Sequence, residues 1–124
     1  MALEDLKQAI PAGHRQMLVT EVTRMKNNMV CTAGIDIHSG TMIRPLQPGG
    51  VNWPQADWVD KDFMCVGNVI VLEPATPSVS AKPHATEDFN VATVTRIAKA
   101  TPAQVFDACV ETADTTLPTF SAIC

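Results

Sequence analysis

The sequence contains no tyrosine, and aromatic residues make up only 5% of its 124 residues. Proteins that grip single-stranded nucleic acid commonly stack the bases on aromatic rings carried by their strands. The aromatic residues here fall in predicted loops or helices, and none lies on the first three predicted strands: Trp53, Trp58, Phe63, Phe89, Phe106 and Phe120. The sequence therefore lacks an aromatic stacking platform on those strands.

Charged residues are also scarce, at 18%, and 13 acidic residues against 9 basic ones give a net charge of −4. This balance excludes the broad cationic surface on which non-specific binders of duplex DNA depend. The hydrophobic share of 46% is enough for one packed core, and the length leaves no room for a second full-sized domain. We therefore expect a single domain over residues 1–124.

The four cysteines include no C-x-x-C pair, so they indicate neither a disulfide scaffold nor a zinc knuckle. The longest apolar run, residues 63–72, is interrupted by Gly67 and Asn68 and is far shorter than the roughly 20 residues that cross a bilayer. The N-terminal segment lacks the basic start and continuous apolar stretch of a secretory signal. We therefore expect a soluble cytoplasmic protein that does not associate with membranes.

Two short helices are predicted to flank the main part of the domain. Two leucines and an isoleucine at helical spacing predict a short amphipathic helix within residues 1–13. The sequence Thr-Pro-Ala-Gln at residues 101–104 is a capping box with proline at the first helical position, which predicts a helix over residues 101–113. The residues between them, 16–97, contain the predicted strands.

Four or five short strands are predicted, and the first two form a hairpin. Apolar runs at residues 17–24 and 29–37 are separated by Lys-Asn-Asn, whose asparagines tolerate positive φ. The odd-numbered residues from Met29 to Ile37 are apolar, which predicts that they face the core. Gly34 within this strand indicates a bend, a bulge or close approach of another backbone. Because no helix separates the first three strands, we expect a β-rich α+β fold built on a small antiparallel β-barrel.

The turn that ends at Gly40 allows the register of the third strand to be predicted. If Gly40 occupies a left-handed bulge position, Asp36 faces Met42. A two-residue turn would instead place Arg44 opposite Ile35, and burying an unpaired guanidinium there would cost several kcal/mol. The bulged register puts Arg44 on the same face as Asp36, within diagonal reach of its carboxylate.

Four segments taken together resemble the motifs of a known family. They are Cys31–Asp36, Met42–Leu46, Gly67–Leu72 and Pro83–Phe89. In this order they resemble the prokaryotic dual-OB domain family, over roughly Met17 to Val91. The resemblance implies an OB-like barrel that binds nucleic acid or a nucleotide-linked ligand. A complete member of that family has two barrels, whereas one barrel's worth of residues is present here, so a second barrel's share of any site would be missing or come from another subunit.

Arg44 is the first candidate for a ligand-binding residue, because it is the one cation inside an otherwise apolar run. Its planar fork of donors suits a phosphate or a carboxylate. The alternative is a structural ion pair with Asp36, and a ligand that displaces Asp36 would reconcile the two interpretations.

The remaining candidates lie in predicted loops. His84, Glu87 and Asp88 stand within five positions after a proline, where they would ligate a metal or supply an acid and a base. The alternative is a turn in which these side chains cap backbone amides. Trp53 would stack a base, or it would cover the open end of the barrel.

From these features we expect an OB-like module, not an enzyme, that binds a nucleotide or single-stranded nucleic acid without a cofactor or a metal. Arg44, Asp36, His84, Glu87, Asp88 and Trp53 are its predicted ligand-binding residues. The alternative hypothesis is a protein interaction or self-association module, such as a homodimer. The third hypothesis is a metal-dependent hydrolase that uses His84 and the two carboxylates after it.

Overall fold

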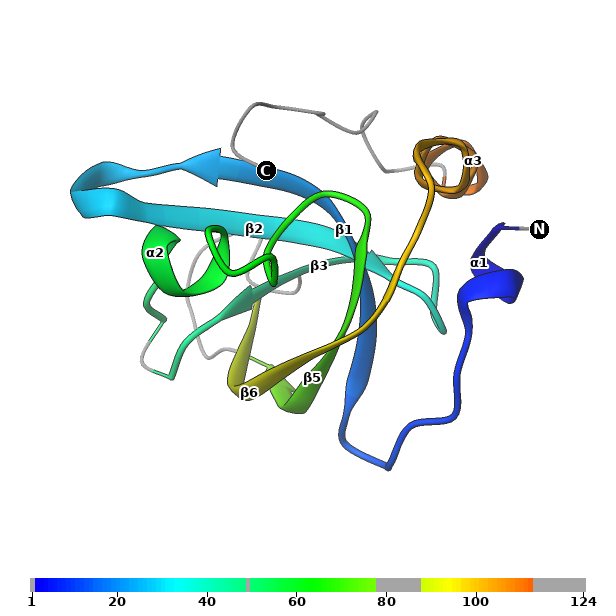
Figure 1. Ribbon diagram of the computed structural model, residues 1–124. Coiled ribbons are helices and arrows are strands. Elements are labelled where there is room, and N and C mark those ends of the chain that lie inside the picture. The colour runs from blue at the N-terminus through cyan, green and yellow to red at the C-terminus, as the bar shows by residue number, and fades with distance from the viewer. Residues whose placement is uncertain (1, 49, 78–87, 113–124) are drawn as a thin grey trace.

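A computed structural model describes residues 2–48, 50–77 and 88–112 of the chain (Figure 1). Short helices accompany a six-stranded sheet that curls around a common interior. The predicted β-rich α+β class with a small barrel-like sheet is confirmed. In chain order the elements are α1 (Ala2–Leu6), β1 (Arg15–Arg24), η1 (Lys26–Asn28), β2 (Met29–Asp36), β3 (Met42–Leu46), β4 (Trp53–Pro54), α2 (Gln55–Trp58), β5 (Asn68–Pro77), β6 (Asp88–Lys99) and α3 (Pro102–Glu111).

The strand pairings form a ring. They run β1, β5, β6, β3, β2 and return to β1, while β4 adds to the edge of β2. One pair departs from the predicted antiparallel arrangement, because β3 and β6 are parallel. The chain enters β6 at the same end of the sheet at which it enters β3, so the two strands run in one direction.

The β1–β2 hairpin is confirmed, and Gly34 is explained by the way its strands meet. The connecting turn contains Asn27 and Asn28 at φ angles of 61° and 57°, the left-handed region that asparagine tolerates. At Gly34 an added Cβ would lie 2.1 Å from the carbonyl oxygen of Leu18 on β1. A side chain cannot fit there, so the glycine permits a close approach of two backbones.

The buried face of β2 differs from the prediction. In the first part of the strand Val30, Thr32 and Gly34 are buried, whereas Met29, Cys31 and Ala33 are only half-buried. The even-numbered residues point into the barrel, where Val30 joins the same cluster as Trp53. The apolar odd-numbered residues lie on the outer side, which is covered only near the end of the strand, where Ile35 packs into a second cluster.

The register of β2 and β3 is also shifted by one residue from the prediction. Ile35 pairs with Met42, and the backbone N–H of Asp36 donates to the carbonyl oxygen of Thr41 over 2.8 Å. A shift of one residue moves every side chain of a strand to the opposite face. Arg44 therefore shares a face with Met42 and Ile35 rather than with Asp36, and the predicted common face of Arg44 and Asp36 is wrong.

Two hydrophobic clusters lie on opposite sides of the sheet. The first fills the barrel interior and includes Met17, Ile43 and Trp53. The second joins the outer side of β1, β2 and β5 to the helices α1 and α3, which lie together beside the barrel (Figure 1). The capping box of α3 is confirmed, since Thr101 and Gln104 exchange both hydrogen bonds. No helix in the described part of the chain is long and apolar enough to cross a membrane.

Candidate ligand pocket

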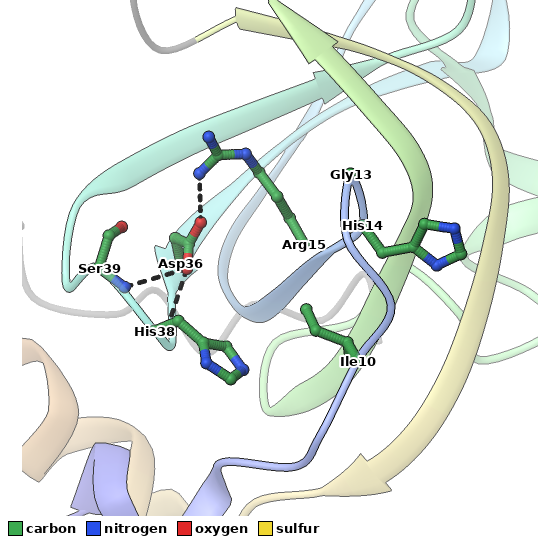
Figure 2. Close-up of a pocket in the computed structure, with 7 residues that line it drawn as sticks. All are labelled: Ile10, Gly13, His14, Arg15, Asp36, His38 and Ser39. Atoms are coloured by element: carbon green, nitrogen blue, oxygen red, sulfur yellow. Dashed lines mark hydrogen bonds and ion pairs between the residues drawn. The ribbon is translucent and has the colours of Figure 1, made fainter.

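A pocket of about 460 Å³ lies where β1 begins and β2 ends (Figure 2). This volume falls within the range of about 300–1,000 Å³ that is typical of small-molecule sites. The segment before β1, the first residue of β1 and the turn after β2 form its walls. The lining residues are Ile10, Gly13, His14, Arg15, Asp36, His38 and Ser39.

Asp36, the last residue of β2, organises one wall of the pocket. Its Oδ1 accepts hydrogen bonds from the backbone N–H groups of His38 at 2.9 Å and Ser39 at 3.2 Å. Its Oδ2 accepts a hydrogen bond from Arg15 Nη1 at 2.6 Å, and the side chain is only 3% exposed. One buried carboxylate therefore fixes the turn after β2 and the position of Arg15 (Figure 2).

The guanidinium of Arg15 is held on two sides. Its Cζ lies 4.3 Å from the centroid of the Phe89 ring, a cation–π contact, and its Nη1 bonds to Asp36. A guanidinium has five N–H donors, and the contacts described for Arg15 use one of them. The side chain of Arg15 is 36% exposed and the residue lines the pocket, so part of the side chain remains accessible.

The second wall of the pocket depends on Gln16, whose side chain is fully buried. Its Nε2 donates to the carbonyl oxygen of Leu6 at 2.8 Å, and its Oε1 accepts from the backbone N–H of Gln8 at 3.0 Å. The same Oε1 lies 2.9 Å from His38 Nε2. These bonds hold the end of α1 at Leu6, within the range predicted for a short helix, and the segment that follows borders the pocket.

His14 adds a further polar group. The residue lines the pocket, and its Nδ1 is buried without a hydrogen-bond partner among the described residues. A buried polar atom without a partner usually marks a position for water or a ligand. The turn that carries His14 is closed by a hydrogen bond from its own N–H to the carbonyl oxygen of Pro11, with Gly13 at a φ of +82°.

The predicted site residues are brought together only in part. Asp36 lies in the pocket, but the cation on its carboxylate is Arg15 from β1. Arg44 is half-buried on the other face of the strand and is paired in register with Asp88 on β6. Of Asp88 only the backbone is described, and the predictions for His84 and Glu87 lie outside the described residues.

Trp53 is part of the core of the barrel. It is 2% exposed, its Nε1 donates to the carbonyl oxygen of Pro45 at 2.8 Å, and its ring meets Trp58 edge to face at 4.7 Å. This arrangement leaves no ring face on which a base could stack, and it agrees with the alternative interpretation in which Trp53 covers the barrel. Trp53 is therefore not included in the candidate site.

Sequence reasoning missed Arg15, His14 and His38. The first strand was expected to begin at Met17, so the residues before it were assigned to a connection. A signal was present, because Gln16 is a polar residue directly before an apolar run and buried amides need partners nearby. His38 follows Asp36 by two residues, where an aspartate commonly caps the next turn.

Over residues 2–48, 50–77 and 88–112, no group of three or more histidine, cysteine, aspartate or glutamate side chains is placed to hold a metal. Comparison of the chain with protein families, with curated proteins and with solved structures finds no match. The similarity to dual-OB proteins therefore stays a prediction. The chemistry of the pocket has to be argued from its own residues.

Proposed function

We propose that this protein is an OB-like binding module whose pocket takes a small anionic ligand of the nucleotide class. The observation that carries the proposal is the placement of Arg15, whose guanidinium is fixed by Asp36 and Phe89 while the residue lines a cavity of about 460 Å³. The ring of five paired strands supports the OB-like assignment, because OB folds are small five-stranded barrels that bind oligonucleotides and oligosaccharides.

The guanidinium N–H groups of Arg15 that do not bond to Asp36 suit a phosphate or a carboxylate. A guanidinium offers parallel N–H donors that match two oxygen atoms. Binding is favoured when the donor does not have to be ordered by the ligand. Asp36 and Phe89 already restrict this side chain. His14 and His38 add polar ring atoms, and Ile10 supplies an apolar wall for the rest of a ligand.

A single nucleotide fits these observations better than a long single strand. Proteins that track single strands combine a cationic groove with exposed aromatic rings. In the described residues Trp53 is buried in the barrel, Phe89 is 6% exposed, and the whole chain carries a net charge of −4. The described barrel strands therefore carry no exposed aromatic platform and the chain has no excess of positive charge, whereas the pocket supplies one fixed cation.

The proposal is tested by isothermal titration of the protein with adenosine monophosphate and with a short oligothymidylate. We expect adenosine monophosphate to bind the wild type, and Arg15→Gln to raise its Kd by at least about tenfold, because a charge-assisted hydrogen bond contributes about 1.5–3 kcal/mol. Arg24→Gln is the matched control, since it removes the same charge from the other end of β1, where the residue is exposed. Equal Kd values for the two variants, or no binding to the wild type, would overturn the proposal.

One feature favours the alternative of a self-association module. Phe106 and Val110 are 49% and 64% exposed, one turn apart on α3. Two side chains provide much less than the roughly 1,200 Å² that stable interfaces bury, so this function ranks second. Sedimentation velocity separates the two hypotheses: a tight dimer of the wild type that Phe106→Ser converts to a monomer would support self-association.

A further inference from the structure

The residues that line the pocket differ in chemistry on the two sides of Asp36. Figure 2 shows the guanidinium of Arg15 on one side of this carboxylate, and the ring of His38 and the side chain of Ile10 on the other. Arg15 supplies a fixed positive charge. His38 supplies a flat ring, and Ile10 is a half-buried apolar residue. A ligand that consists of an anionic group alone would use only the Arg15 side.

The ring of His38 is held in place although the residue is exposed. Its Nε2 lies 2.9 Å from Oε1 of Gln16, whose side chain is fully buried. Gln16 Nε2 donates to the carbonyl oxygen of Leu6 at 2.8 Å, so the amide has one orientation and presents its oxygen to the ring. The backbone N–H of His38 donates to Asp36 Oδ1 at 2.9 Å. The pocket is therefore lined by an exposed aromatic residue whose ring has a defined orientation.

We propose that the ring of His38 stacks against the base of a nucleotide whose phosphate is bound by Arg15. The inference rests on the proposed function, and it names the residue of the same site that recognises the base. Ile10 packs against the base as an apolar neighbour, and the sugar joins the base to the phosphate across Asp36. The site therefore takes a nucleoside monophosphate in preference to a smaller anion.

His38 has the properties that stacking requires. Bases stack on histidine rings as they do on the rings of phenylalanine, tyrosine and tryptophan. The aromatic residues that the structure describes on strands, Trp53 and Phe89, are only 2% and 6% exposed, whereas His38 is exposed and lines the pocket. Because Gln16 already orders the ring, stacking costs little conformational entropy. Every base has a flat face, so the stack does not select one base over another.

The experiment is an isothermal titration of the full chain with adenosine monophosphate and with ribose phosphate, which carries the sugar and the phosphate without a base. We expect the wild type to bind adenosine monophosphate at least about fivefold more tightly, the lower end of what stacking of one base contributes. His38→Gln removes the ring but keeps an N–H that can donate to Gln16. In this variant the Kd of adenosine monophosphate should approach that of ribose phosphate.

His38→Phe is the matched variant, because it keeps a flat ring and removes the N–H that faces Gln16. It should bind adenosine monophosphate at least about fivefold more tightly than His38→Gln does. A residue that only held the turn through Gln16 would give the reverse order, with the preference for adenosine monophosphate kept in His38→Gln and lost in His38→Phe. That order would overturn the inference, as would loss of the preference in both variants.

Equal Kd values of the two ligands for the wild type would also overturn the inference. In each of these cases, weaker binding of adenosine monophosphate to Arg15→Gln than to the wild type would leave the proposed function intact. Failure of adenosine monophosphate to bind the wild type would overturn both.

Discussion

Asp36 and Asp62 each form an ion pair with an arginine in the described part of the chain, and the surroundings of these two pairs differ. Asp36 is 3% exposed and bonds to Arg15, and both residues line the pocket. Asp62 is 43% exposed and bonds to Arg96 and Lys99 at the end of β6 that is remote from Phe89. An aspartate–arginine ion pair with a buried carboxylate therefore lies at the pocket, and one with an exposed carboxylate lies on the surface.

The contacts of Asp62 show a structural role. It has a φ of 60°, and it joins the loop after α2 to β5 and β6, because Asn68 Nδ2 donates to its carbonyl oxygen at 2.8 Å and to its Oδ1 at 3.2 Å. Burial alone would raise the pKa of Asp62. The hydrogen bonds from Lys99 and Asn68, with the charges of Lys99 and Arg96, outweigh this effect and lower the pKa below its ordinary value.

This difference separates a structural ion pair from a candidate binding group. The oxygens of Asp62 are taken up by side chains that hold a loop in place, and its cations face solvent. Asp36 also holds a turn, but the arginine that it orients is partly exposed and lines a concave site. The environment of the cation, rather than the presence of the pair, indicates function.

The largest effect is expected from Asp36→Ala. The substitution removes three hydrogen bonds to a buried carboxylate and leaves Arg15 without its anion, so we expect the free energy of unfolding to fall by about 3 kcal/mol. Urea denaturation measures this loss, and Asp60→Ala, at an exposed loop position, is the matched control. A loss below about 1 kcal/mol would show that Asp36 stabilises the protein no more than an exposed aspartate does, which would contradict the difference between the two ion pairs.

A smaller effect is expected from Asp62→Asn. Asparagine tolerates the left-handed backbone at this position, so the variant removes the charge without adding strain. Exposed ion pairs contribute little, and we expect a loss of less than about 1 kcal/mol at neutral pH. Urea denaturation measures the difference, and a loss as large as that of Asp36→Ala would contradict the comparison.

The stability lost in Asp62→Asn should depend on pH in a definite direction. The folded state lowers the pKa of Asp62 below the ordinary value of 3.8, so its ionised form stabilises the protein above that pH. The stabilisation disappears as the pH falls through the folded pKa. Denaturation curves of wild type and Asp62→Asn should therefore converge in that acid range, and a gap that persists at the lowest pH would show that the charge is not its cause.

The smallest effect concerns salt. Ions screen exposed charges strongly and buried pairs much less. Raising the salt concentration to about 1 M should remove most of the stability difference between wild type and Asp62→Asn while it preserves most of the difference for Asp36→Ala. Equal salt sensitivity of the two differences, measured by urea denaturation, would argue that both pairs are equally exposed to solvent.

Local signals in the sequence were sufficient for several elements of the fold. The hairpin follows from two apolar runs around Asn27 and Asn28, and α3 follows from its capping box. Gly34 was expected to permit a bend, a bulge or a close backbone approach, and the carbonyl of Leu18 supplies the close approach. Each of these features is decided by residues that are neighbours in sequence or by one missing side chain.

The candidate site could not be predicted in the same way, because it depends on the register. Asp36 accepts hydrogen bonds from the N–H groups of His38 and Ser39, and after the turn that these bonds hold, β3 lies one residue from its expected register. That shift carries Arg44 to the other face. Pairing of Met17 with Asp36 then brings Arg15 beside the carboxylate, a contact between residues 21 positions apart.

Binding at this pocket is tested by titrating the isotope-labelled protein with adenosine monophosphate. The titration is monitored through the backbone amide and arginine Nε signals in two-dimensional NMR spectra. We expect the shifted signals to belong to residues 10–16 and 36–39 and to include Arg15 Nε, while Arg24 Nε stays unchanged. Shifts confined to the outer face of β2 and β3, around Cys31 and Arg44, would contradict the account, as would a spectrum that does not change.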